Sequence, residues 1–252
     1  MAPHLRQQPP VREDCDTCAV RDRSVCGALT TGQLMPLATM RRIERLAVGE
    51  TIAWEGAPSV MIAIVRQGLV GRSLLLADGR EQVVGLAFAG DMVGRPFAAI
   101  SDHSLTAITP TVLCVFPRAA FERFAAASPP LEHAMLLQSL DALARTHRNM
   151  LMLVRMSAPQ RIATFLLDLA ERGDRTPAGH IAIPLGRQQI ADLLGLSIET
   201  VSRRLRAFER AGHIGLPGQR TLVMHDPTAL AAIAGGRGTP SLPADGRRQV
   251  MA

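Results

Sequence analysis

Four cysteines are the residues of this 252-residue chain whose type and spacing most clearly suit a metal. Three follow one another as Cys15-x2-Cys18-x7-Cys26, and Cys114 lies far downstream. Thiolates bind zinc and iron–sulfur clusters, and four of them match the ligand set of a [4Fe–4S] cluster. A zinc ribbon normally has two CxxC pairs, whereas this chain has one. The spacing alone leaves zinc and iron–sulfur equally open, with unrelated free cysteines as a third interpretation.

Two other uses of the cysteines fit the sequence poorly. Covalent haem attachment needs a histidine directly after the CxxC pair, but Ala19 stands there. Disulfides need an oxidising compartment. The first residues lack the apolar core of a secretory signal, and no apolar run is long enough to span a bilayer. We therefore expect a protein of the reducing cytoplasm with no membrane partner.

The segment 186–214, GRQQIADLLGLSIETVSRRLRAFERAGHI, predicts a helix-turn-helix. Gly195 supplies the tight turn, and Ser197 is a good N-cap for the second helix. At 100° per residue, one face of that helix is apolar and formed by Val201, Leu205 and Phe208.

The opposite face of the second helix carries side chains suited to DNA, and Ser202 lies among them. Glu199 can accept from cytosine N4, and Arg203 can donate to guanine O6 and N7. We assign Arg204 and Arg206 to phosphates. The alternative is an ordinary amphipathic helix whose polar face is merely solvated. The net charge of +6 suits a polyanionic partner.

A long helical segment after Ser128-Pro129-Pro130 predicts dimerisation. Apolar residues recur along it at heptad spacing, which is typical of a helix that pairs with its own copy. The alternative is a long core helix within one subunit. The predicted seam consists of Leu136, Leu140, Leu143, His147, Met150 and Val154.

Between about residues 43 and 118, short apolar runs alternate with glycines, which indicates a β-sandwich or barrel. Asp78-Gly79 marks the clearest hairpin. The histidines are scattered, and no HExxH or other hydrolytic motif is present, so we expect no enzyme.

The recognition segment LGLSIETVSRRLRAFERAGHI resembles that of the CRP/FNR superfamily of bacterial regulators. The Glu-x-x-Ser-Arg pattern of Glu199, Ser202 and Arg203 resembles its FNR branch, whereas the cyclic-AMP-responsive branch usually has Arg before the Glu and Gly in place of the Ser. Here Ile198 and Ser202 stand at those positions. The resemblance extends from about residue 15 to 234 and implies a homodimer that reads a two-fold TTGAT–N4–ATCAA operator in double-stranded DNA.

The same resemblance implies that Cys15, Cys18, Cys26 and Cys114 hold a [4Fe–4S] cluster. The C-x2-C-x7-C spacing resembles the FnrL/FnrN/FixK-like oxygen sensors rather than the enterobacterial member, whose last gap is shorter. In that family the cluster stabilises the dimer, and oxygen dismantles the cluster and releases DNA. Residues 15–30 have little apolar content, so we expect ligation to supply their order.

Cyclic-nucleotide-binding relatives clasp their ligand with a Gly-Glu pair and an Arg-Ser pair. At the corresponding places Asp91 follows Gly90, and His103 stands before Ser104. Arg95 is interpreted as an exposed loop residue. Without the arginine that would bind a phosphate bidentately, we expect no cyclic nucleotide to bind.

By this resemblance the fold class is α+β with five parts. The hairpin tip Asp78-Gly79-Arg80 matches a loop that contacts RNA polymerase in such activators, although a plain solvated turn is the alternative. The parts are a cysteine-bearing segment at 1–30, a cyclic-nucleotide-binding-like β-roll (jelly roll) at 31–127, a dimerisation helix at 128–156, a winged helix-turn-helix at 157–234 and a disordered tail at 235–252.

Overall fold

The computed structural model describes residues 15–235 and divides the chain into two compact units, Met1–Asn149 and Met150–Ala252. The predicted disorder of residues 1–14 and of the tail beyond Gly235 lies outside the described residues. Within the described part, no helix is long and apolar enough to cross a membrane.

The first unit opens with two short 3-10 helices, η1 (Cys15–Thr17) and η2 (Val25–Ala28), and the helix α1 (Thr31–Met40). α1 begins at a capping box. The Thr30 hydroxyl accepts from the Gln33 backbone N–H, and Oε1 of Gln33 accepts from the Thr30 backbone N–H. The sequence analysis missed this helix. Its cap motif was a usable signal, but Pro36 inside the helix obscures the periodic pattern.

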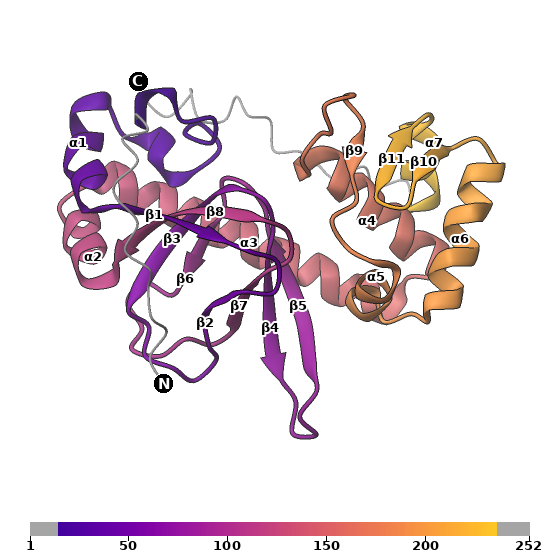
Figure 1. Cartoon of the computed structure of the whole chain (residues 1–252), viewed down its shortest axis with the longest axis horizontal. Helices are drawn as coiled ribbons and strands as arrows, with labels where there is room; N and C mark the ends of the chain where they lie inside the picture. Colours follow the sequence, from indigo (N-terminus) through magenta and orange to yellow (C-terminus); the bar gives the residue numbers. More distant parts are fainter. Residues whose placement is uncertain (1–14, 236–252) are drawn as a thin grey trace. The chain divides into compact units, whose positions relative to one another are not determined.

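Two antiparallel four-stranded sheets follow, in the orders β1-β8-β3-β6 and β2-β7-β4-β5 (Figure 1). The predicted Asp78-Gly79 hairpin is confirmed: it joins β4 to β5, and Gly79 adopts the left-handed φ of 83°. Apolar side chains from both sheets form one core cluster. The strands are β1 (Arg42–Leu46), β2 (Thr51–Ala53), β3 (Met61–Gln67), β4 (Val70–Leu75), β5 (Glu81–Ala87), β6 (Met92–Gly94), β7 (Ser104–Ala107) and β8 (Thr111–Pro117).

The helices α2 (Arg118–Ala126) and α3 (Pro129–Arg155) complete this unit, with the boundary between the units inside α3. A second core cluster joins Leu131 and Met135 of α3 to Val25 and Leu29 of the cysteine-bearing segment. The segment packs through the few apolar side chains that it has, and the expectation that ligation supplies its order stays a prediction. Val20, Val25 and Leu29 are all buried, and burial of such side chains anchors the segment.

The second unit is built of helices around a small sheet of order β10-β11-β9. The predicted helix-turn-helix and the hairpin after it are both present, and the wing-like hairpin is β10 with β11. The elements are α4 (Ala158–Arg172), β9 (Ile181–Ala182), α5 (Arg187–Leu194), α6 (Ile198–Arg210), β10 (Ile214–Gly218), β11 (Thr221–Met224) and α7 (Pro227–Ile233).

Candidate functional site

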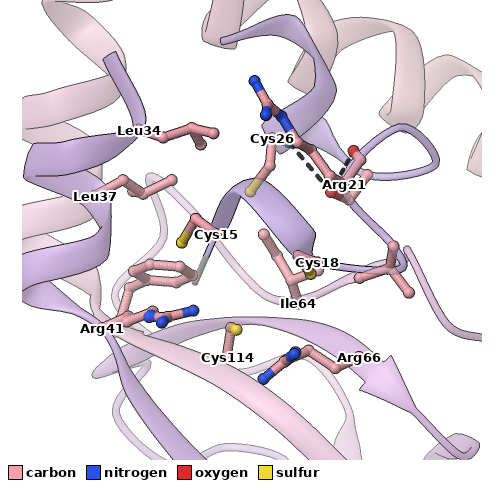
Figure 2. A pocket seen from close by; sticks show the side chains of 13 residues that line it. Cys15, Cys18, Arg21, Cys26, Leu34, Leu37, Arg41, Ile64, Arg66 and Cys114 are labelled. Atoms are coloured by element: carbon pink, nitrogen blue, oxygen red, sulfur yellow. Dashed lines mark hydrogen bonds between the residues drawn. The ribbon is translucent and has the colours of Figure 1, made fainter. Parts of the chain in front are cut away.

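All four cysteines line one pocket in the first unit (Figure 2). Cys15 lies on η1, Cys18 just after it, Cys26 on η2 and Cys114 on β8. Apolar side chains make much of the wall, and three arginines complete it. The other lining residues are Val20, Arg21, Ser24, Leu34, Leu37, Arg41, Ile64, Arg66 and Phe116.

The sheet register places Cys114 at the floor of this pocket. It pairs with Ile43 of β1 on one side and with Ile64 of β3 on the other. Directly paired residues of antiparallel strands point to the same face of a sheet. Cys114 and Ile64 are both buried in the cluster that also contains Leu34 and Leu37 of α1. The fold therefore brings the distant cysteine to the face on which residues 15–26 rest.

Hydrogen bonds hold the loop between Cys18 and Cys26 in place. The Ser24 hydroxyl accepts from the Cys26 backbone N–H at 3.3 Å and donates to the Arg21 carbonyl at 3.0 Å. Nη2 of Arg21 donates to the Leu29 carbonyl at 3.0 Å. These bonds leave the Cys26 side chain directed into the pocket (Figure 2).

The two most deeply placed thiols are difficult to ionise in the free protein. Burial raises the pKa of Cys26 to about 12, although the hydrogen bond with Ser24 opposes this, and the other three cysteines raise it further. Burial also raises the pKa of Cys114 to about 11 against the opposing charges of Arg66 and Arg41. Because a thiol must lose its proton to bind a metal, a bound group has to supply enough positive charge to displace these protons.

The four thiols match the ligand number of a [4Fe–4S] cluster and also that of a structural zinc site. Zinc bonds each sulfur at about 2.3 Å, so all its ligands must converge on one point. In the part of the chain that the structure describes, no group of three or more His, Cys, Asp or Glu side chains is arranged to hold a metal ion. The four described cysteines are nevertheless free and share a single pocket. An iron–sulfur core is held by cysteine thiolates, and four cysteines in a largely apolar pocket are compatible with one.

The recognition helix α6 has the two faces that its sequence predicts. The Ser197 hydroxyl accepts from the Thr200 backbone N–H at 3.3 Å, which confirms the N-cap, and Gly195 takes a left-handed φ of 60°. Val201, Leu205 and Phe208 are buried. Arg161 of α4 donates to the Leu194 carbonyl at 2.8 Å and thereby fixes the turn between the two helices, a role for which the sequence shows no local signal.

On the opposite face of α6, Glu199, Arg203 and Arg206 are exposed and Ser202 is half-buried. The backbone N–H of Glu199 and the Ser197 hydroxyl hold the pKa of the Glu199 carboxyl below its usual value. Glu199 is therefore an ionised acceptor at neutral pH. Arg204 differs from the other candidates because it is half-buried and its Nε is buried without a hydrogen-bond partner. Its assignment to phosphates stays a prediction.

Comparison with known proteins reveals the family. Residues 43–128 match the cyclic nucleotide-binding domain, and residues 160–233 match the Crp-like helix-turn-helix domain. The transcriptional activator protein FnrL of Cereibacter sphaeroides is 33% identical over 245 residues, which cover 95% of this chain and 99% of that protein. The nitrogen fixation regulation protein FixK of Bradyrhizobium diazoefficiens is 33% identical over 237 residues, or 93% and 99% of the two chains. This chain belongs to the CRP/FNR family of DNA-binding transcription regulators.

A solved structure supports the same assignment. FixK2 from Bradyrhizobium japonicum superposes with a TM-score of 0.71 at 30% identity, covering 77% of this chain and 96% of that one. The predicted fold class is thus confirmed: a β-rich cyclic-nucleotide-binding-like domain, a long helix and a C-terminal helix-turn-helix. The prediction that the chain is a regulator rather than an enzyme is confirmed as well, since its relatives are transcription regulators.

In this CRP/FNR regulator a small pocket lies at the place where the resemblance puts the Arg-Ser pair of a nucleotide clasp. Gly94, Arg95 and His103 line it, whereas Gly90 and Asp91 are not among the residues that line it. Asp91 instead accepts from the Phe88 backbone N–H at 2.9 Å and closes a turn. The prediction that Arg95 is an exposed loop residue is confirmed, and its Nη1 lies 3.6 Å from the Asp102 carboxylate.

The Asp102 carboxylate also meets Nδ1 of His103 at 2.9 Å. Burial opposes ionisation of Asp102, but the hydrogen bond and charge of His103, together with Arg95, outweigh it and lower the pKa of Asp102. An ionised carboxylate at this place repels a phosphate.

The predicted dimer seam lies along one exposed stripe of α3. Leu136, Leu140, Leu143, Met150 and Val154 are between 51% and 76% exposed, and His147 is exposed too. A helix that packed only within its own subunit would bury such a stripe. Large exposed apolar patches mark interaction sites.

Proposed function

We propose that this chain is an oxygen-responsive transcriptional activator whose four cysteines hold a [4Fe–4S] cluster at low oxygen. The observation that carries the proposal is the convergence of Cys15, Cys18, Cys26 and Cys114 on one apolar pocket. The similarity to FnrL, a transcriptional activator protein, and to FixK, a nitrogen fixation regulation protein, supports an activating role. When bound, the cluster supplies a cross-link between the N-terminal segment and β8 that oxygen can remove.

The cysteine-bearing segment and the long helix α3 meet at one turn, which supports control of dimerisation by the cluster. A Cβ added to Gly90 would lie 2.9 Å from the Arg23 carbonyl oxygen, so the backbone of the segment rests directly on this glycine. Nε2 of Gln138 on α3 donates to the Gly90 carbonyl at 3.1 Å, and its Oε1 accepts from the Met92 N–H at 3.3 Å. A change in the order of residues 15–30 therefore acts on the surface that positions α3.

The cluster-bound form is a homodimer joined through the exposed stripe of α3. Each subunit offers apolar side chains at heptad spacing, and pairing with a second copy removes them from water. Leu140→Asp places a charge in this seam. We expect a folded monomer that fails to bind the operator, whereas a dimer by light scattering would exclude this seam.

The dimer reads a two-fold TTGAT–N4–ATCAA operator through α6. Glu199 and Arg203 contact base edges with Ser202 beside them, and Arg204 and Arg206 contact phosphates.

The exposed β4–β5 hairpin tip, with its Asp78–Arg80 ion pair at 2.7 Å, faces RNA polymerase. No cyclic nucleotide takes part in regulation, because Arg95 and His103 both interact with the Asp102 carboxylate and not with a phosphate. The protein works in the reducing cytoplasm, where the thiols stay available.

The decisive experiment is the ultraviolet–visible spectrum of protein isolated without oxygen, measured before and after admission of air. We expect a straw-brown protein with close to four iron and four sulfide per chain, in keeping with four thiolate ligands. Air should bleach it and abolish operator binding in a gel shift.

The second candidate is a regulator of the same fold in which zinc or another redox input replaces the cluster. The single set of four cysteines in one pocket is compatible with it. A colourless protein with one zinc per chain, whose DNA binding is unaffected by air, would establish this candidate and refute the first.

A further inference from the structure

Two arginines, Arg41 and Arg66, line the pocket together with Cys114. Ile43 and Ile64 are the direct cross-strand partners of Cys114. Arg41 stands two residues before Ile43, and Arg66 stands two residues after Ile64. Arg41 caps the end of α1 directly before β1, and Arg66 lies within β3. The register of β3 with β8 shifts between Val65 and Gln67, and such a bulge re-aims the side chain at its centre.

Both arginines belong to the cysteine pocket itself. They are half-buried, and they line the pocket together with the four cysteines (Figure 2). The Arg41 side chain forms a hydrogen bond with Cys114, and the charge of each guanidinium favours the Cys114 thiolate. None of the described residues that line the pocket is an aspartate or a glutamate.

Arg21, the third arginine of the pocket, serves a different purpose. Its Nη2 donates to the Leu29 carbonyl, so it ties the cysteine-bearing loop together. Arg41 and Arg66 come instead from the β-domain side of the pocket, where Cys114 is the only cysteine among the described residues.

We propose that Arg41 and Arg66 are positioning residues that lie beside Cys114 in the pocket and offset the negative charge of the bound cluster. Four thiolates give the assembled group a negative net charge, and both net charge and hydrogen bonds to sulfur set the reduction potential of such a group. Two adjacent cations raise that potential, which makes loss of an electron to oxygen less favourable. The pair therefore sets the oxygen level at which this regulator switches. This inference rests on the proposed function.

The test compares wild-type protein with the double variant Arg41→Gln/Arg66→Gln and with Arg41→Lys/Arg66→Lys, all purified without oxygen. The matched control is Arg123→Gln, which removes one positive charge from the exposed face of α2. Three quantities are measured: iron and sulfide per chain, the reduction potential from an anaerobic redox titration, and the rate of visible bleaching in air-saturated buffer. The unfolding temperature of each apo-protein shows that the variants fold.

We expect the double glutamine variant to have a lower potential and to bleach about tenfold faster than wild type, since hydrogen bonds to charged groups have effects of that size. Failure of the folded variant to load iron, with loading restored by the lysines, supports the proposal equally. Arg123→Gln should match wild type.

Wild-type potential and bleaching rate in the double glutamine variant would overturn the inference. So would a lysine variant that folds but behaves like the glutamine variant, because it would show that shape rather than charge matters. A wild-type protein that binds no iron refutes the proposed function instead, so the two failures are distinguishable.

Discussion

The recognition helix and the cysteine pocket assemble their functional side chains in opposite ways. On α6, the candidate DNA contacts lie within eight consecutive positions from Glu199 to Arg206, and helical periodicity alone brings all of them except Arg204 to one side. In the pocket, residues 15–26 meet Cys114 only because β8 lies between β1 and β3. A substitution on α6 should therefore remove one DNA contact and leave the others in place. A substitution in the pocket should instead affect binding of the whole cluster, because its ligands come from distant segments.

The largest expected effect comes from Cys114→Ser, which removes the only ligand on the β-domain side. We expect loss of nearly all iron and sulfide, a mostly monomeric protein and loss of operator binding. Metal analysis and light scattering without oxygen measure these changes, with the unfolding temperature of the apo-protein as the folding control. A dimeric variant that keeps its cluster would show that Cys114 is not a ligand. The ligands would then all come from residues 15–26, and the pocket would be as local as the DNA contacts of α6.

Glu199→Ala and Arg203→Ala test whether single side chains of α6 read the base sequence of the operator. Each should reduce discrimination between operator and altered operator by about 1–3 kcal/mol, because one base-edge contact is lost. Competition gel shifts with operator and scrambled DNA measure this, while binding to scrambled DNA should be unchanged. Equal weakening on every sequence would contradict a base-reading role.

Gln138→Leu addresses the link between the pocket and α3. It removes the two hydrogen bonds to the turn at Gly90 and Met92, so we expect dimerisation to weaken about tenfold, at about 0.5–1.5 kcal/mol per bond. Cluster content should stay at the wild-type level. Sedimentation velocity without oxygen provides the measurement. Ser139→Ala is the matched control, because Ser139 bonds only to the Met135 carbonyl of its own helix in the contacts that the structure describes. Unchanged dimerisation would show that the turn does not transmit the state of the pocket.

Arg206→Ala should have the smallest effect. A phosphate contact contributes equally on all sequences, so binding to operator and scrambled DNA should weaken alike, and the salt-dependence slope should fall by about one. Affinity titrations at several salt concentrations check this. A loss confined to the operator would instead make Arg206 a base-reading residue.

Much of the second unit could be read from the sequence because its signals are local. The cap at Ser197, the turn at Gly195 and the buried face of α6 each depend on residues a few positions apart, and all three are present in the structure. The small helix α7 was missed, although Asp226 and Pro227 are ordinary start signals for a helix.

By itself the sequence determined the helix-turn-helix, the β4–β5 hairpin and the number and type of candidate ligands. Whether Cys114 could join the other three cysteines was decided only by the tertiary structure, because strand order and register are not local properties. The same holds for Arg41 and Arg66 beside Cys114, for Gln138 at the Gly90 turn and for Asp102 between Arg95 and His103. The spacing of residues along the chain predicts which of them share a helix face. A pocket between segments about ninety residues apart cannot be predicted in this way, because it forms only when the strands pair.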